Sequence, residues 1–358
     1  MRWNSSIRAV AGLFRFDRQE ATLWKILRGR ILADILTLAT QNLLTPMILC
    51  FALGLAAAIA RSDLSVPEAA AKMMSLYLLF AIGFKGGVAV ADHGLDGQLI
   101  GALAGGVALS FALPFVAFAL LRAITRMSAL DAAAVAAHYG SISIVTFVTA
   151  TSVLTARGIA AEGYMVAVAA AMEAPAIVSA LWLVSRGGTG AGMRMDARLW
   201  HEILLNGSIV LLVGSFLIGL ATGAPGMARI SAFIVAPFQG VLCLFLLDMG
   251  LVAGRGLRSA RGVLDWRAVA FGVIMPVIGA AAGLGMAMVL GLSGGGMALM
   301  MVLSASASYI AVPAAMRVAL PEANPSIYLT LSLGVTFPFN LIIGIPACVA
   351  IALALTQG

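Results

Sequence analysis

Long apolar stretches alternate with short polar ones from about residue 42 to the end of the chain. Within these stretches apolar residues follow one another directly, whereas in a membrane β-barrel they would alternate with polar residues. A helix needs about 20 mainly apolar residues to cross the hydrocarbon layer of a membrane. The pattern therefore predicts ten membrane-spanning helices, over residues 42–60, 67–91, 97–122, 130–155, 161–185, 201–222, 229–254, 267–291, 296–319 and 325–355.

Composition also places the chain in a lipid bilayer. Of its 358 residues, 62% are hydrophobic and only 10% are charged, with a mean hydropathy of +1.05. A soluble domain carries about 25% charged residues. The net charge of +7 does not indicate nucleic acid as a partner. Its Lys and Arg residues gather near the N-terminus and in short loops beside the apolar stretches, where such residues set membrane orientation.

Polar stretches divide the chain into four parts. Residues 1–34 form a basic, amphipathic segment that is typical of the membrane surface. The glycine-rich linker 186–200 then separates five predicted helices in residues 35–185 from five more in residues 201–358. Because five is an odd number, the second set enters the membrane with the opposite orientation. Inverted repeats of this kind are typical of secondary transporters.

Three short sequence matches, in the same order in both halves, support such a repeat. Their offsets are 167, 165 and 163 residues, and they pair 82–87 with 249–254, 140–143 with 305–308, and 174–177 with 337–340. The predicted fold class is therefore an all-α membrane protein of ten helices in two inverted five-helix repeats. Helices broken in mid-membrane are expected where the two repeats meet.

Sequence signatures of enzymes are missing from the chain. It has no HExxH or CxxC motif and no P-loop, and its three histidines lie far apart. We therefore expect no enzymatic activity, no resident metal and no cofactor. Because ATP-driven pumping needs a P-loop, an ion gradient is the expected source of energy for any transport.

Two predicted helices carry serine-rich stretches that favour a break in the helix. The fourth contains Gly140-Ser141-Ile142-Ser143, and the ninth contains Ser304-Ala305-Ser306-Ala307-Ser308. Serines two positions apart do not share a face of a regular helix, so they converge on one ligand only where the backbone unwinds. Gly140 permits unwinding, and Pro313 removes a hydrogen bond to the carbonyl of Tyr309. The N–H groups freed there suit an anion, whereas hydroxyls and carbonyls suit a sodium ion.

Ionisable residues inside predicted helices are the other functional candidates, because burying them in a membrane is costly. Glu173 precedes Pro175 in the fifth helix, and its repeat partner is Thr336. Oxygens from these two places would complete a cation site, although Glu173 also fits a structural hydrogen-bonding role. Lys85 and Asp248 either pair across the repeat interface, or Lys85 extends to the membrane surface.

Besides the serine-rich stretches, the chain contains IGFKGG at 82–87, MEAP at 172–175 and ALPEANPSIY at 319–328. Through these motifs together, it resembles the cyanobacterial-type sodium-dependent bicarbonate transporters. The resemblance covers most of residues 42–355. It implies a gate domain of predicted helices 1, 2, 6 and 7, and a core domain of the other six. It further implies an elevator-like movement, a homotrimer in the bacterial cytoplasmic (inner) membrane, and a PII-like regulatory protein as a partner.

The resemblance also implies that sodium and bicarbonate bind between the fourth and ninth helices. The substrate-binding candidates are Gly140, Ser141, Ser143, Ser306, Ala307 and Ser308. The sodium-binding candidates are Thr146, Glu173, Ser304, Tyr309, Thr336 and Asn340.

One position departs from the family pattern, because Tyr309 stands where the family has an acidic residue. The prediction is therefore sodium symport of a small anion, most simply bicarbonate. The alternative within the same class is sodium- or proton-coupled transport of another small organic or inorganic anion. A membrane sensor or scaffold that uses residues 1–34 to recruit a partner is the alternative from another class.

Overall fold

The computed structural model describes residues 37, 40, 43–94, 97–173, 175–186, 205, 207–259, 265–310, 312, 313, 316, 320 and 322–356. All regular secondary structure in these residues is helical. The predicted segment 1–34 and residues 187–200 of the predicted linker lie outside the described residues.

The helices of the first half follow the predicted spans. They are α3 (Pro46–Ile59), α4 (Glu68–His93), α5 (Gly97–Ile124), α6 (Ala129–Gly140), α7 (Ile144–Ala156), α8 (Met165–Ala171) and α9 (Pro175–Arg186). The fourth predicted span is thus divided into α6 and α7, and the fifth into α8 and α9.

The second half contains α11 (Gly207–Ile234), α12 (Phe238–Ser259), α13 (Trp266–Leu290), α14 (Gly294–Ala305), α16 (Pro325–Leu329), η1 (Thr330–Thr336), α17 (Phe337–Phe339), η2 (Asn340–Gly344) and α18 (Ile345–Thr356). In the described part of the chain, eight helical stretches are long and apolar enough to cross a membrane, and α3 and α14 are shorter apolar helices. The chain is therefore a multi-pass, all-helical membrane protein.

The sixth predicted span ends where it was expected, but the predicted start of the seventh span is wrong. We expected helices over 201–222 and 229–254, but α11 continues to Ile234. Within α11, Gly223 has a φ of 56°, a conformation that glycine adopts without steric cost, and helical residues resume directly after it. Pro225 fits there because the first residues of a helix need no N–H partner. The sixth span thus ends at this kink, and a second helical stretch up to Ile234 precedes α12 where one continuous seventh span was expected.

The last predicted span, 325–355, is a mixed helix. Short α-helical segments alternate in it with the π-helical segments η1 and η2. Pro338 and Pro346 lie within it and supply no N–H to the helical ladder. π-Helical turns are rare and occur mostly at functional sites.

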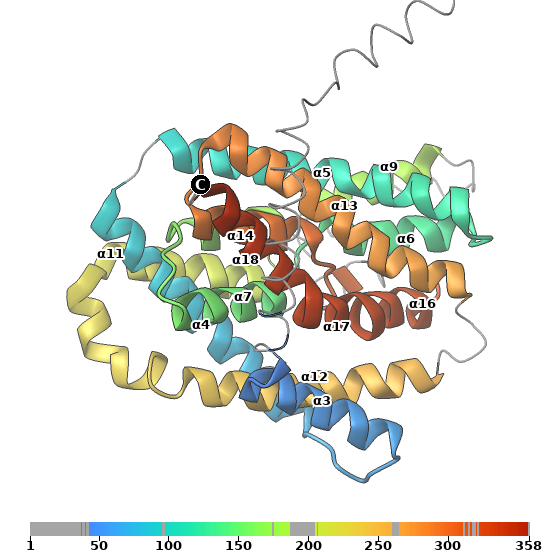
Figure 1. The fold of residues 1–358 in the computed structure, drawn as a ribbon, viewed down its shortest axis with the longest axis horizontal. Coiled ribbons are helices and arrows are strands. Elements are labelled where there is room, and N and C mark those ends of the chain that lie inside the picture. The colour runs from blue at the N-terminus through green and yellow to red at the C-terminus, as the bar shows by residue number, and fades with distance from the viewer. Residues whose placement is uncertain are drawn as a thin grey trace, which may run out of the picture.

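Close glycine contacts hold α3, α4, α11 and α12 together, and we call these four helices the glycine-packed group. On α4, a Cβ at Gly83 or Gly87 would overlap the backbone of α11. At the equivalent places on α12, a Cβ at Gly250 would overlap the carbonyl oxygen of Phe51, and Gly254 faces α3 in the same way. Figure 1 shows α3 lying along α12 at the lower edge of the molecule. Backbones packed this closely form a rigid unit.

The other helices pack around the two divided spans, and we call them the broken-helix group. α5 contacts α6, α9 and α13, while α14 contacts α13, α7 and α18. In Figure 1, α5 and α13 lie on the opposite edge of the molecule from α3 and α12, and α14 and α18 lie between those two edges. The divided spans are thus inside the molecule: every residue from Ala132 to Ala150 is buried.

Small residues also line one contact between the two groups, on the side of α4 that faces α8. A Cβ at Gly86 would meet the side chain of Val166, and a Cβ at Gly163 would meet Ala89. We call these four residues the small-residue seam. On the other side of the molecule, α12 contacts η1, where the hydroxyl of Thr330 lies 3.5 Å from the carbonyl oxygen of Gly256.

Replacing Gly250 by Ala is expected to destabilise the protein, because the new Cβ would overlap the carbonyl oxygen of Phe51. Overpacking of this kind costs about 1–3 kcal/mol. Gly214 on α11 is the matched control, since a Cβ there meets nothing within 4 Å. Gly214→Ala should be neutral or slightly stabilising, because alanine favours helix over glycine. Thermal unfolding of both variants in detergent measures the difference, and equal stabilities would contradict the close packing.

Candidate functional site

The fourth and ninth predicted spans break with the same backbone geometry. α6 ends at Gly140 and is followed by Ser141, whose φ and ψ are −85° and 160°. α14 ends at Ala305 and is followed by Ser306, with −84° and 163°. In both spans the serine directly after the helix is therefore extended. The predicted breaks are confirmed at both places.

The two helices that lead into these breaks also begin alike. α6 and α14 each contain 12 residues. The hydroxyl of Ser128 accepts a hydrogen bond from the N–H of Asp131, and the hydroxyl of Ser293 accepts one from the N–H of Gly296. Ser128 and Ser293 are 165 positions apart, as are the serines at the two breaks. The starts and ends of these helices thus repeat with the spacing of the serine match.

The two broken segments are bound directly to each other. The N–H of Ser143 donates to the hydroxyl oxygen of Ser306 (2.9 Å), and the N–H of Ser308 donates to the carbonyl of His138 (2.8 Å). The Ser306 hydroxyl in turn donates to the carbonyl of Leu303 (2.8 Å). Each break therefore satisfies a backbone N–H of the other, which the apolar interior requires.

We call the place where the two broken segments meet, residues 141–143 and 306–308, the crossing. A third break brings a carboxylate to this crossing. Glu173 lies between α8 and α9, directly after Met172, and its side chain is 6% exposed. Its Oε2 accepts a hydrogen bond from the hydroxyl of Ser141 (3.0 Å). Ser110 on α5 fixes this break by donating to the carbonyl of Met172 (2.6 Å). No basic side chain of the described residues pairs with Glu173, so its burial demands a proton or a cation.

A small cavity at the crossing brings several of the predicted residues together. It has a volume of about 10 Å³, which is room for about one water molecule. Its walls are Ile142, Ser143, Ile144, Glu173, Ser308, Tyr309 and Ile310. The side chains that line it carry three hydroxyls and one carboxylate, an oxygen-rich set suited to a small ion.

The helix ends at the crossing have opposite polarity. α7 begins there, and the N–H groups of Ile144 and Val145 in its first turn have no acceptor among the described residues. α6 and α14 end there with their carbonyl groups. N-terminal ends of helices favour anions and C-terminal ends favour cations. The crossing therefore offers electrostatic stabilisation to an anion and a cation side by side.

Three further predicted residues support the crossing without lining the cavity. Thr146 donates to the hydroxyl of Ser143 through both its N–H (3.2 Å) and its own hydroxyl (2.9 Å). Ala307 is buried in the extended part of the ninth span. Gly140 has a helical backbone, and a Cβ there would overlap Pro114 of α5. Gly140 is thus required by close packing, and the predicted role as a point of unwinding is wrong.

The reason given for the second break also needs correction. We expected Pro313 to cause it, but the helix has already ended at Ala305, and the chain stays non-helical through Ile310. Pro313 lies in the helical residues that resume afterwards. The break instead occurs where Ser306 turns its hydroxyl back to the carbonyl of Leu303.

Besides Thr146, three more predicted sodium ligands are not among the residues that line the cavity. Ser304 lies against Gly283 of α13. Thr336 donates to the carbonyl of Gly272 (2.6 Å) and contacts the hydroxyl of Tyr139 (2.7 Å). Asn340 is the third, and its amide donates to the carbonyl of Ala305 (2.9 Å). These side chains anchor α13, η1 and η2 to the broken spans.

Sequence reasoning missed two residues that shape the site. The ring of His138 donates to the carbonyl of Ala134 (2.7 Å) and stacks on Tyr328, with centroids 4.5 Å apart. Its own carbonyl, however, holds Ser308. Ser110 was overlooked because a lone serine in an apolar helix carries no pattern. Its partner, a backbone carbonyl at the third break, becomes visible only in three dimensions.

Replacing Ser306 by Ala should lower thermal stability by about 1–3 kcal/mol, because the buried N–H of Ser143 would lose its acceptor. Ser304 is the matched control two residues earlier in the chain. Its buried hydroxyl has no partner among the described residues, so Ser304→Ala should leave stability unchanged or raised. Unfolding in detergent, followed by tryptophan fluorescence, compares the two. A larger loss in Ser304→Ala would contradict the hydrogen bonding described above.

Comparison with known protein families shows which family the chain belongs to. Residues 46–353 match the Na⁺-dependent bicarbonate transporter superfamily, a match that includes all three breaks and both helix groups. A search of curated proteins finds no match. A transporter family also confirms the expectation that the chain is not an enzyme. With most of its length matched, the chain belongs to the Na⁺-dependent bicarbonate transporter superfamily.

Proposed function

We propose that the protein is a secondary active transporter that imports a small anion, most simply bicarbonate, together with sodium. One observation carries this proposal: a small cavity lies between two crossing broken helices and is lined by Ser143, Ser308, Tyr309 and Glu173. Sites of this kind, at discontinuous helices near the middle of the membrane, are typical of ion-coupled transporters. Membership of the family supports the choice of ion and anion.

The charges at the crossing give a physical reason for coupling. The anion would accept hydrogen bonds from the free N–H groups of Ile144 and Val145 and from the Ser143 and Ser308 hydroxyls. The Glu173 carboxylate is buried beside this place, and two negative charges there would repel each other strongly. A sodium ion between them, held by Glu173 and nearby oxygens, removes that repulsion. The anion would therefore bind well only with its cation.

The helix groups suggest how the bound ions would cross the membrane. In this proposal, ten helices form two inverted repeats, residues 35–185 and 201–358, with the glycine-packed group as the gate and the broken-helix group as the core. The core would carry its site past the gate in an elevator-like movement. The family resemblance further suggests a homotrimer in the bacterial cytoplasmic membrane and a PII-like regulatory partner.

A second substrate assignment follows from Tyr309. This residue lines the cavity where the family has an acidic side chain, so one negative charge is missing from the cation site. A cation site with fewer negative charges binds sodium more weakly or suits a different coupling ion. The second candidate is therefore sodium- or proton-coupled transport of another small organic or inorganic anion.

Uptake of labelled bicarbonate into proteoliposomes tests the first assignment. An inward sodium gradient should stimulate uptake in the native protein. Glu173→Gln and Ser308→Ala should each lower the initial rate at least about tenfold, because each loses an interaction with one of the two ions, and about 1.4 kcal/mol corresponds to a factor of ten.

Thr149→Ala serves as the control for these variants. Thr149 is buried in α7 like the site residues, but its hydroxyl donates to the carbonyl of Val145 within its own helix. Uptake by this variant should match the native protein. Sodium-driven uptake at the native rate in Glu173→Gln would overturn the proposed cation site. If folded native protein takes up no bicarbonate, the second assignment is favoured and is tested with other small anions and a proton gradient.

A further inference from the structure

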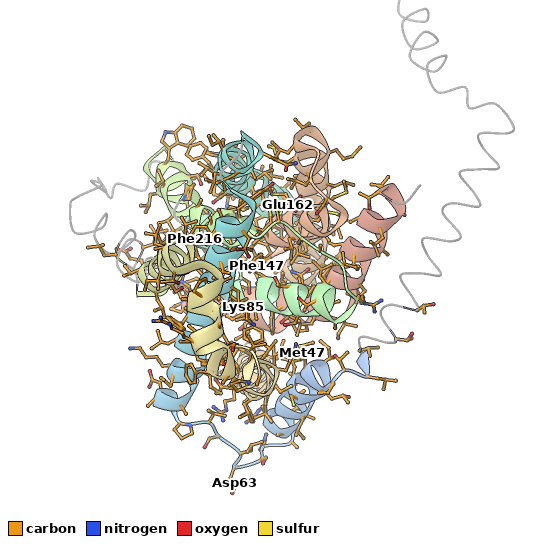
Figure 2. All side chains as sticks on the ribbon, turned by 90° about the vertical axis from the view of Figure 1, so that its left-hand side faces the viewer. Met47, Asp63, Lys85, Phe147, Glu162 and Phe216 are labelled. Carbon is orange, nitrogen blue, oxygen red and sulfur yellow. The ribbon has the colours of Figure 1, made fainter. Side chains whose placement is uncertain are left out.

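A second and larger cavity, of about 410 Å³, lies between the two helix groups. One wall is α4 of the glycine-packed group. The opposite walls are α7, the start of α8 and the loop 158–163 of the broken-helix group. Figure 2 looks onto this side of the molecule, with Phe147 between Glu162 and Lys85 in the view. The cavity therefore borders both groups, at the surface where one would move against the other.

The cavity leads from the loop toward the crossing. Its outer end is lined by Thr155 and Gly158, which are exposed, and the exposed Arg157 lies between them in sequence. Its inner end is lined by Phe147. The N–H of Phe147 donates to the carbonyl of Ser143 (3.0 Å), so this wall is one helical turn from the candidate site.

Lys85 supplies an uncompensated positive charge in this cavity. It is half-buried within α4, and its Nζ lies 4.3 Å from the centre of the Phe238 ring. No carboxylate of the described residues pairs with it, and the pairing with Asp248 considered from the sequence is not formed. A half-buried ammonium that lies against an aromatic ring retains most of its attraction for an anion.

The acidic residue of the cavity wall does not cancel this charge. Glu162 accepts hydrogen bonds from the N–H of Ser293 (2.7 Å) and from its hydroxyl (3.0 Å), at the N-terminus of α14. Both carboxylate oxygens are thus engaged with the end of a helix whose dipole is positive there. The negative charge of Glu162 is therefore held at one end of the cavity and is already compensated.

The cavity does not have the chemistry of a tight binding site. The hydroxyls of Thr151 and Thr155 donate within their own helix, to the carbonyls of Phe147 and Thr151 (2.9 Å each). Lys85 is then the main group left to attract an anion, and the volume leaves room for water around a small anion. Such a cavity raises the local concentration of anions without holding one in place.

We propose that this cavity is the vestibule through which anions approach the crossing, and that Lys85 selects them by charge. The inference rests on the proposed function only for the destination of the anion. Lys85 would contribute to specificity by attracting anions from a distance, and it would not contact the anion bound at the crossing. Removing its charge should therefore weaken the approach of anions while leaving the site at the crossing intact.

Thiol accessibility tests the vestibule without any transport assay. In a background where Cys50, Cys243 and Cys348 are replaced by Ala, Thr151→Cys places a thiol inside the cavity. The purified protein in detergent is treated with the anionic sulfonatoethyl or the cationic trimethylammonioethyl methanethiosulfonate. We expect the ratio of anionic to cationic rates to exceed that of a free thiol by about tenfold. Lys85→Met should abolish this excess, Lys85→Glu should reverse it, and Lys85→Arg should retain it.

A control thiol and a second test position complete the experiment. Ser62→Cys places a thiol in the exposed loop between α3 and α4, and its rate ratio should not respond to changes at Lys85. Thr155→Cys provides a second position, nearer the cavity mouth, if Thr151→Cys does not fold. A thiol that fails to react at both positions, or a ratio that is unchanged in Lys85→Met, overturns the inference.

A transport measurement separates this inference from the proposed function. Lys85→Met should raise the KM for the anion several-fold with little change in maximal rate, and should reduce the dependence of uptake on ionic strength. Charge-selective thiol modification without bicarbonate uptake would retain the vestibule and reject the substrate. Sodium-driven bicarbonate uptake without charge selectivity would retain the function and reject the role of Lys85.

Discussion

The rest of the structure depends on an exchange of hydrogen bonds between two broken helices. A helix that ends in mid-membrane exposes backbone groups that lipid cannot satisfy. Here Ser306 and His138 accept the N–H groups of Ser143 and Ser308, so each break satisfies part of the other. Neither break is stable without its partner, and the surrounding helices must hold the two in register. The close approach of Gly140 to α5 and the anchoring of Ala305 by Asn340 serve this requirement.

The two helix groups are packed in different ways. The glycine-packed group gains its rigidity from backbones in direct contact, with few polar side chains inside it. The broken-helix group instead buries many hydrogen-bonded polar side chains, among them Ser110, Ser141, Glu173 and Ser306. Polar networks in an apolar interior hold only one arrangement well, because any unpaired member is costly. Most of the buried polar side chains thus belong to the broken-helix group, which packs against the glycine-packed group.

The sequence predicted the helical class, most spans and both serine breaks, because these follow from local properties: apolar length and hydroxyl spacing. It could not predict that a separate helical stretch runs from the kink at Gly223 to Ile234, since a kink and a loop have the same composition. It grouped Thr336, Ser304 and Asn340 with the sodium site because they are polar and lie in equivalent spans. Which face of a helix such residues occupy is decided by packing against α13, which no local pattern records.

The small-residue seam has a mechanical consequence. Large side chains that interlock across an interface must leave their holes before one helix can slide along another. Gly86, Ala89 and Gly163 present no such projections, and the side chain of Val166 lies against Gly86. If α8 slides along α4 at this contact, the van der Waals contacts that are lost would therefore be replaced by new ones of nearly equal energy. The energy barrier to sliding at this contact would therefore depend on the size of its side chains and not on the strength of any single bond.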